Sequence, residues 1–512
     1  MTAATQAPPQ AHDLTPAQRA LIMVPMCFGA TLFILNQTNI VVSLPHMQGT
    51  FSATRDQISW VLTSYIVAMT IAVAATGWFS GRFGRKNVFV WALVGFTVMS
   101  FLCGTATSLE EEVVYRMIMG LFAGPIMPLS QAIVLDTFPK EQHGRALSLW
   151  GLGITIAPVA GPWIGGILTE QYGWPWVFYF NIPLGAVLVF FAVAFVPKVE
   201  RNPSRHFDWS GFIALAIAVT MLQFILNRGQ RLDWFDSIEI LVSFAVMAAA
   251  FYIFVVHSLT TMRPFLEPAM FRDRNAIVGF VFIFCWALVV NSPTVLLALR
   301  LQNIDDYPVE TIGWLLMPRG IGGVFAMLIV GRVIKVIDPK HVVCAGFLMI
   351  ASGCWIMSGW SLSANVTEIW IAGIVYGMGI ALIYVPVTTY AFATIDPRYR
   401  TDVSALYSLM LNMGSGIGIT IAIIVLTQAV QVSHEDLSQN VSQYNELFRE
   451  PAIAESWGLG SERGLRRIEN QIQLQATAIA YNNTFWMLAL WAIAVSPVIY
   501  FIARTPRRRR RR

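Results

Sequence analysis

Four consecutive polar residues, Asn36-Gln37-Thr38-Asn39, lie inside the first long apolar run of the chain, in the stretch Leu32–Pro45. Amide and hydroxyl side chains form hydrogen bonds, but they do not release a proton near neutral pH. A polar group in hydrocarbon needs a partner. We therefore predict that Asn36 and Thr38 contact a substrate or take part in coupling. Gln37 and Asn39 point to other sides of a helix and are expected to bond to neighbouring helices.

Two arginines also fall inside apolar runs, Arg116 and Arg319. A cation at membrane depth is costly and is a functional candidate by default. Helical spacing places Asn36 and Arg116 in the same outer half of the membrane, where they could meet across a central cavity. Unpaired arginines facing that cavity would favour an anionic or weakly acidic substrate. Alternatively, each bonds to backbone carbonyls and Asn side chains, or Arg116 extends outward as an anchor.

Other polar residues complete the predicted substrate and coupling set. Asn291 and Asn412 lie in later apolar runs, and Asn291 is at a distance from the start of its run similar to that of Asn36. No acidic residue is expected deep in any run. Asp136, at the end of the fourth run, is the best acidic candidate, and it could join Arg145 and a basic turn in a cluster that latches the cytoplasmic gate. The predicted gate set is Gly77, Arg82, Gly84, Arg85, Asp136 and Arg145.

The fifth apolar run is rich in glycine and proline. Glycine allows helix backbones to approach closely, and proline removes a backbone hydrogen bond and bends a helix. Together they indicate a pliable helix contact, although ordinary packing of small residues is the simpler alternative. The residues concerned are Pro158, Gly161, Pro162, Gly165 and Gly166.

The elements that position these residues are membrane-spanning helices. The 512 residues are 56% hydrophobic and only 12% charged, against about 25% charged in a typical soluble domain. A span needs about 20 mostly apolar residues, and a helix satisfies its own backbone. We predict fourteen spans, near 20–43, 57–78, 88–107, 113–135, 146–168, 176–196, 210–227, 238–257, 275–299, 311–331, 341–361, 367–390, 403–428 and 482–503.

The loops between these runs alternate in Lys and Arg content, which predicts that both termini are cytoplasmic. A weak repeat maps the first six spans onto the last six and leaves two inserted helices between them. The predicted parts are a cytoplasmic tail (1–19), a six-helix half (20–196), the insert with its flanking loops (197–274), a second six-helix half (275–503) with an outer segment (429–481), and an Arg-rich cytoplasmic tail (504–512).

Several motifs in register resemble those of a known family. These are the Gly77–Lys86 turn, Arg116 with Gly120, the fifth-run glycines and prolines, residues 32–45 and 56–65, and residues 478–485. The chain resembles the major facilitator superfamily, specifically its 14-span drug:proton antiporters of the EmrB type. Asn36 stands where this branch usually has an aspartate that is implicated in coupling and cation recognition. An amide keeps the hydrogen bonding and loses the titration.

The resemblance implies an all-α major facilitator fold and a secondary active multidrug exporter. Such an exporter would be coupled to the proton gradient, without a cofactor, and would lie in the bacterial inner membrane. It implies hydrophobic and possibly weakly acidic substrates, a periplasmic adaptor of the membrane-fusion type and an outer-membrane channel. The alternatives are a fatty-acid or lipid-like metabolite exporter, and a non-transporting receptor or assembly subunit. No metal spacing, phosphate loop or catalytic triad supports an enzyme, and no nucleic-acid partner is expected.

Overall fold

The computed structural model describes residues 14–197, 207–261, 264–266, 268–396, 399–439, 441 and 461–502. Fourteen helices of this part are long and apolar enough to cross a membrane, which confirms the predicted number of spans. The Arg-rich tail 504–512, most of the tail 1–19 and the middle of the outer segment lie outside the described residues.

The first half of the chain forms eight helices from six spans. Thr15 and Thr54 begin the first two, and each accepts a hydrogen bond from the backbone of a Gln three residues later, whose side chain bonds back. This capping box satisfies backbone donors that a helix start leaves free. The helices are α1 (Pro16–Thr50), α2 (Arg55–Phe83), α3 (Arg85–Thr105), α4 (Leu109–Ala123), α5 (Ile126–Thr137), α6 (His143–Tyr172), α7 (Trp176–Tyr179) and α8 (Asn181–Phe195).

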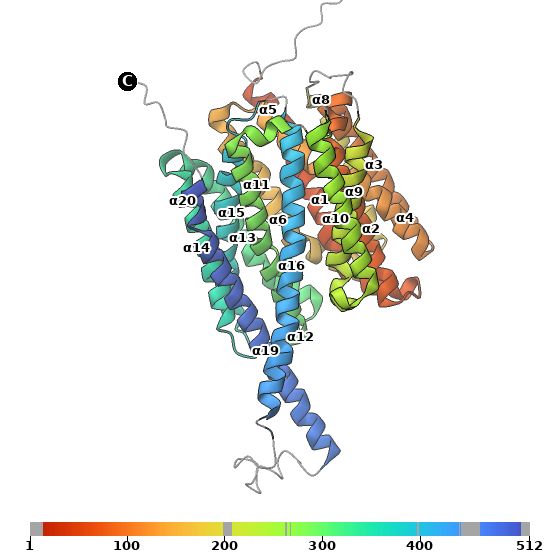
Figure 1. The fold of residues 1–512 in the computed structure, drawn as a ribbon, viewed down its shortest axis with the longest axis vertical. Coiled ribbons are helices and arrows are strands. Elements are labelled where there is room, and N and C mark those ends of the chain that lie inside the picture. The colour runs from red at the N-terminus through yellow and green to blue at the C-terminus, as the bar shows by residue number, and fades with distance from the viewer. Residues whose placement is uncertain are drawn as a thin grey trace, which may run out of the picture.

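Two further spans and a second half follow (Figure 1). Helix α9 packs against α10, and also against α2 of the first half and α16 of the second. The remaining helices are α9 (Trp209–Arg228), α10 (Ile238–Thr260), α11 (Arg274–Val290), α12 (Ser292–Asn303), α13 (Val309–Val336), α14 (Pro339–Ser358), α15 (Val366–Ala391), α16 (Arg400–Gln439), α19 (Glu462–Val495) and α20 (Val498–Ile502).

Among the described residues four spans are split between two α-helices, the fourth, sixth, ninth and fourteenth, and proline explains the breaks in the fourth and the ninth. The fourth span changes from α4 to α5 at Gly124-Pro125, and the ninth changes from α11 to α12 at Asn291. Pro293 follows this second break; it has no N–H and its ring crowds the carbonyl four residues earlier. Each break frees backbone carbonyls inside the bundle, so other side chains must satisfy them.

Helix α6 continues through both of its prolines and packs on two sides. Two of its glycines pack closely on α1, because a Cβ at Gly161 would overlap the Thr38 hydroxyl and one at Gly165 would lie 2.6 Å from the Asn39 carbonyl oxygen. Its other side packs along α13 of the second half. Glycine contacts therefore lie on both sides of α6, because a Cβ at Gly144 would meet Ile334 of α13 and one at Gly151 would meet Met327 of α13.

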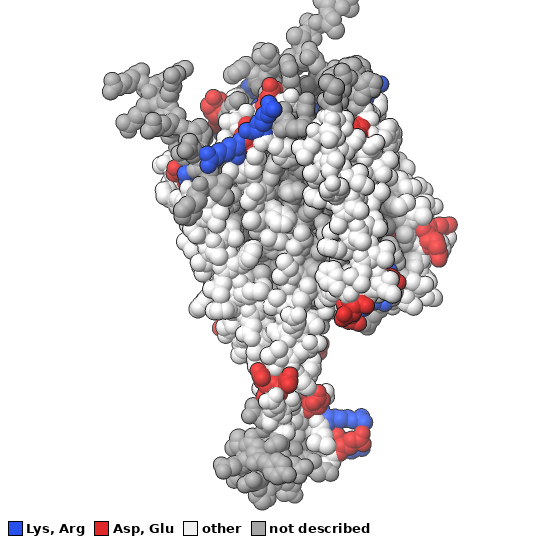
Figure 2. Space-filling view, viewed as in Figure 1, with Lys and Arg blue, Asp and Glu red and all other residues white. Residues whose placement is uncertain are grey.

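The last two long helices extend beyond the bundle as a pair, which we call the stalk (residues 429–439 and 461–481; Figure 1). Residues 464–480 of the outer segment are helical as part of α19. Span 13 was predicted to end at 428, and α16 continues beyond that residue as one helix to Gln439. His434 Nε2 lies 2.8 Å from Glu469 Oε1 across the pair. Figure 2 shows charged residues near this stalk and at the opposite end, with a nearly uncharged side surface between them.

Candidate functional site

Asn36 and Arg116 meet inside the first half. Arg116 Nη1 donates to Asn36 Oδ1 at 2.9 Å, and both residues are 0% exposed. Helix α1 supplies the amide and α4 the guanidinium. The close approach of α4 to α2 depends on Gly120, where a Cβ would lie 2.5 Å from the Tyr65 carbonyl oxygen. The contact that the sequence suggested is therefore present, whereas its role in transport stays a prediction.

Aromatic rings and a backbone carbonyl also contact Arg116. Its guanidinium carbon lies 4.1 Å from the centre of the Tyr65 ring, and Nε reaches the Val61 carbonyl at 3.4 Å. Its Nη2 has no hydrogen-bond partner among the described residues. The guanidinium is thus held by the neutral Asn36 amide and the face of the Tyr65 ring, and its Nη2 lacks a partner among the described residues.

The other polar residues of α1 have different surroundings. Thr38 Oγ1 donates to carbonyls of its own helix and reaches the Ala157 carbonyl of α6 at 3.4 Å. Gln37 Nε2 lies 2.9 Å from Met69 Sδ of α2. The prediction that Asn39 bonds to a neighbouring helix is wrong, because neither atom of its amide has a partner within the described part of the chain. Gly165 of α6 instead packs closely against the Asn39 backbone.

A buried acid that the sequence analysis did not single out lies at the start of the fourth span. Glu112 lies in the first turn of α4 and is 0% exposed. The predicted span began one residue later, at 113. A helix turn separates Glu112 from Arg116, so the two share a face of α4.

Arg319 lies beside the break in the ninth span. Its Nη2 donates to the Val290 carbonyl at 3.2 Å, and its guanidinium lies 5.0 Å from the centre of the Tyr376 ring. The Tyr376 hydroxyl donates to the same carbonyl at 2.7 Å. Both side chains therefore satisfy backbone that the break sets free. This geometry supports the alternative in which Arg319 bonds to backbone carbonyls.

The two asparagines of the second half lie near this break. Asn291 forms it, and its Nδ2 donates to Ser415 Oγ of α16 at 2.7 Å. Asn412 is half-buried on α16, one turn before Ser415. Neither residue contacts the Asn36–Arg116 pair through a hydrogen bond that the described residues make.

An ionic cluster joins the two halves at the end of the bundle opposite the stalk, which we call the basic end. Asp136 at the end of α5 pairs with Arg85, and with Arg400 of the second half at 2.6 Å. Arg400 Nη1 also donates to the Leu135 carbonyl at 3.1 Å. Arg85 is the predicted partner of Asp136, and Arg400 was missed because it precedes an apolar run like an ordinary loop charge.

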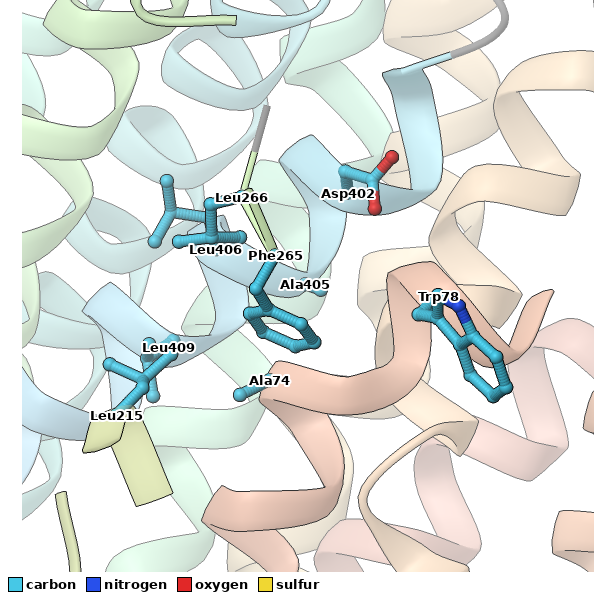
Figure 3. A pocket seen from close by; sticks show the side chains of 9 residues that line it. All are labelled: Ala74, Trp78, Leu215, Phe265, Leu266, Asp402, Ala405, Leu406 and Leu409. Carbon is cyan, nitrogen blue, oxygen red and sulfur yellow. The ribbon is translucent and has the colours of Figure 1, made fainter. Parts of the chain in front are cut away.

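The other residues of the predicted gate surround this cluster. Arg145 is exposed and Arg82 half-buried, and neither forms an ion pair within the described part of the chain. Gly84 joins α2 to α3 with φ +88°, a conformation that favours glycine. Asp402 of α16 approaches α2 at Gly77, where a Cβ would overlap its carboxylate. Figure 3 shows Asp402 and Trp78 at a small pocket between α2, α9 and α16.

Deeper inside, hydrogen bonds and aromatic rings continue the contact between the halves. Ser404 of the second half donates to Gln131 Oε1 of the first at 3.1 Å. The rings of Trp150 and Tyr384 lie 6.3 Å apart across the halves, and Trp286 lies 5.3 Å from Tyr384. These three aromatics form one cluster between the halves.

Arg300 is a buried cation that lies one residue beyond the predicted ninth span, 275–299. It lies in α12, is 0% exposed, and donates to Asn482 Oδ1 of α19 at 2.9 Å and to the Ser361 carbonyl at 2.5 Å. Burial raises the pKa of the neighbouring Asp305 carboxyl, and the Arg300 charge opposes that rise. Arg300 ties α12 to the base of the stalk helix, which is a structural role.

These features define a multi-pass helical membrane protein with two bundles in contact. Among the described residues no group of three His, Cys, Asp or Glu could hold a metal ion. A family model described as Major Facilitator Superfamily matches residues 26–419, and the chain belongs to this superfamily.

The chain is similar to curated exporters over nearly its whole length. It is 28% identical to the multidrug export protein EmrB of Escherichia coli K12, covering 96% of this chain and 97% of that protein. It is also 28% identical to the fatty acid resistance protein FarB of Neisseria gonorrhoeae, covering 95% and 97%. The resemblance to EmrB-type multidrug exporters is thereby confirmed.

Solved structures agree on the fold. The human organic anion transporter MFSD10 superposes with a TM-score of 0.61 at 14% identity, covering 94% of this chain and 100% of that one. The proton:xylose symporter XylE gives 0.60 at 13% identity, covering 95% and 96%. At these identities the likeness concerns the major facilitator fold alone.

Proposed function

We propose that this chain is a secondary active multidrug exporter that works by alternating access. The observation that carries the proposal is the Asp136 cluster, in which one carboxylate is shared between Arg85 of the first half and Arg400 of the second. An ionic contact of this kind can be made and broken as two rigid halves rock. Opening the basic end requires this contact to break, so it serves as the latch of that end.

The basic end faces the cytoplasm in this proposal, and the stalk faces outward. Lys and Arg concentrate on the cytoplasmic side of membrane proteins, and Arg85, Arg332 and Arg400 lie at that end. The membrane is the bacterial inner membrane, in line with the bacterial relatives. The proton gradient is the energy source.

The cargo is a set of hydrophobic compounds, and the test is their accumulation in cells. Cells with and without the chain are loaded with ethidium, N-phenyl-1-naphthylamine or labelled laurate, which are cationic, neutral and anionic. We expect lower accumulation of at least one compound, and loss of that difference when the transmembrane pH gradient is collapsed. No difference for any of them would overturn the exporter proposal and favour a receptor or assembly subunit.

A fatty-acid exporter is the second candidate. Two observations favour it: the similarity to FarB, whose name concerns fatty acid resistance, and the Arg116 nitrogen without a partner among the described residues, which offers a donor to a carboxylate. Selective export of laurate, with ethidium and N-phenyl-1-naphthylamine unaffected, would decide for it.

The stalk is the proposed contact for a periplasmic adaptor of the membrane-fusion type, which in turn would reach an outer-membrane channel. The α16–α19 pair extends past the bundle and carries exposed apolar residues such as Val432 and Leu465. Replacing residues 436–464 with a short Gly-Ser linker tests this. We expect co-purification with the adaptor to be lost and transport by the chain alone in proteoliposomes to remain. Unchanged co-purification would contradict the assignment.

A further inference from the structure

We infer that Glu112 carries the coupling proton of this exporter and that its charge controls the contact between Arg116 and Asn36. The inference rests on the proposed proton-driven export. It assigns to α4 the titration that an asparagine at position 36 cannot perform.

Glu112 differs from the two acids that precede it. Glu110 and Glu111 are exposed, and Glu111 accepts hydrogen bonds from the Thr107 backbone and hydroxyl. Glu112 is 0% exposed, and neither of its carboxyl oxygens has a hydrogen-bond partner among the described residues. Glu111 is thus a surface acid at the start of the helix, and Glu112 beside it is a buried acid without a hydrogen-bond partner among the described residues. An unpaired buried carboxyl favours its protonated form, so a change in protonation has structural consequences at Glu112 and not at Glu111.

The groups that face Glu112 include one permanent charge. Arg116 is one turn away on α4, the Cys103 thiol faces it from α3, and Tyr65 of α2 lies over the same guanidinium. Helix α1 adds the neutral amide of Asn36 on the far side of Arg116. Within the described part of α1, α2, α3 and α5, no further acid or base faces the carboxyl. Arg116 is thus the cation available to an ionised Glu112.

Two arrangements follow from this geometry. An ionised carboxylate in a dry interior is costly unless it is paired, so it would draw the Arg116 guanidinium toward it. A protonated carboxyl needs no cation and leaves Arg116 to its amide partner. The structure has the second arrangement, because Arg116 bonds to Asn36 and forms no ion pair with Glu112 among the described residues. It therefore corresponds to the proton-loaded form.

A change between these two arrangements is transmitted to the second half through helices that pack against one another. When Glu112 loses its proton, Arg116 turns toward it and releases Asn36 of α1. Helix α1 lies against the glycine face of α6 at Gly161 and Gly165, and the opposite side of α6 packs along α13. A contact at Arg116 that has two states can therefore shift the equilibrium between two relative orientations of the halves. The step moves a proton onto or off a Glu112 oxygen, and no electrons are exchanged.

Glu112 also lies at the end of the bundle from which protons would enter. It lies in the first turn of α4, at the end of the bundle away from the Asp136 cluster. In the proposed orientation this is the outer end, where protons enter an antiporter that runs on the proton gradient. The Asp136 cluster then latches the opposite end while Glu112 takes up its proton.

The test uses the full chain in proteoliposomes, with ethidium, N-phenyl-1-naphthylamine or laurate, whichever the wild type moves fastest. Glu112→Gln imitates the protonated acid. We expect transport driven by a pH gradient to fall by about tenfold or more, while exchange of labelled for unlabelled compound without a gradient stays within about twofold. The matched control is Glu110→Gln, an exposed neighbour of the same chemistry, which should behave as the wild type.

Each outcome separates the two proposals. A wild type that moves none of the compounds refutes the exporter and leaves Glu112 without a coupling role. Proton-driven transport that survives in Glu112→Gln overturns the inference alone, and so does equal loss of driven transport and exchange. If Glu112→Gln does not fold, Glu112→Asp keeps a carboxyl one methylene shorter; driven transport should persist with a shifted pH profile, and an unchanged profile overturns the inference.

Discussion

Among single residues, Asn36 has the largest consequence for mechanism. Its amide oxygen holds Arg116 at 2.9 Å, so the side chain provides binding without titration. A carboxylate at the same place would hold the guanidinium more strongly, because it would add the attraction between opposite charges to the hydrogen bond. Position 36 and position 112 thus flank Arg116 from two helices, and either could supply its counter-charge.

The first prediction uses the fact that positions 36 and 112 lie on two sides of Arg116. In the Glu112→Gln background, Asn36→Asp places a titratable acid on the other side of Arg116. We expect it to restore proton-driven transport to within about tenfold of the wild type, measured as compound-dependent proton movement in proteoliposomes. Asn36→Ala in the same background offers no acid and should restore nothing. Equal transport by the two double variants would show that the charge beside Arg116 is not the coupling group.

The second prediction separates a structural from a substrate role for Arg319. Its guanidinium donates to the Val290 carbonyl at the helix break, to which the Tyr376 hydroxyl also donates, so Arg319→Ala removes a hydrogen bond to a charged group at a cost of about 1.5–3 kcal/mol. We expect a lower unfolding temperature of the purified protein, and an equal fall in transport of every compound that the wild type moves. A fall confined to laurate would contradict this and identify Arg319 as an anion-binding residue.

The types and spacing of residues in the sequence predicted some members of the candidate site and missed others. The sequence predicted the Asn36–Arg116 contact because helix spacing fixes depth. Glu112 was missed by a boundary placed one residue late, although three consecutive acids before an apolar run were visible. Arg400 was missed because a cation before a span is ordinary evidence of topology, and only the fold brings it to Asp136, which lies 264 residues earlier.

At the scale of elements, α6 shows what composition predicts and what it leaves open. Its glycines and prolines predicted close packing, and the close packing is present at α1. The partner helix could not be predicted, because small residues allow approach without specifying what approaches. Likewise Pro293 was visible in the sequence, but the break at Asn291 and its rescue by Arg319 and Tyr376 depend on three separate helices.

The third prediction compares two glycines of α6. A Cβ at Gly161 would overlap Thr38 of α1, whereas the nearest atom to a Cβ at Gly166 is 3.9 Å away, on Val42. Gly161→Ala should therefore force the helices apart and cost about 1–3 kcal/mol, and Gly166→Ala should be nearly neutral. Thermal unfolding of the two purified variants checks this. If Gly166→Ala is the more destabilised variant, the packing of α6 on α1 is wrong.

At the scale of the whole molecule, the number of spans was predictable and the contacts between the halves were not. Fourteen apolar runs appear in the sequence because lipid demands continuous helices. The contacts between α2 and α16, and between α6 and α13, depend on tertiary packing that leaves little mark on hydropathy. The basic end illustrates this, since its partners come from α3, α5 and α16.

The last prediction concerns the latch between the halves. Asp136→Asn leaves Arg85 and Arg400 without their shared carboxylate, and breaking a largely buried ion pair costs about 3 kcal/mol. We expect the basic end to open more often. Cysteine introduced as Ser404→Cys, at a position that is 0% exposed, should then react faster with a maleimide in a background without the five native cysteines.

Export should fall in the same Asp136→Asn variant, because a bundle that does not close at the basic end cannot present an outward-facing cavity without a leak. Glu141→Gln removes an exposed acid at the same end and is the control for general charge effects. Faster labelling at position 404 with undiminished export would mean that the cluster holds the halves together without taking part in the transport cycle. Unchanged labelling would mean that packing of α6 on α13 closes this end without the ion pair.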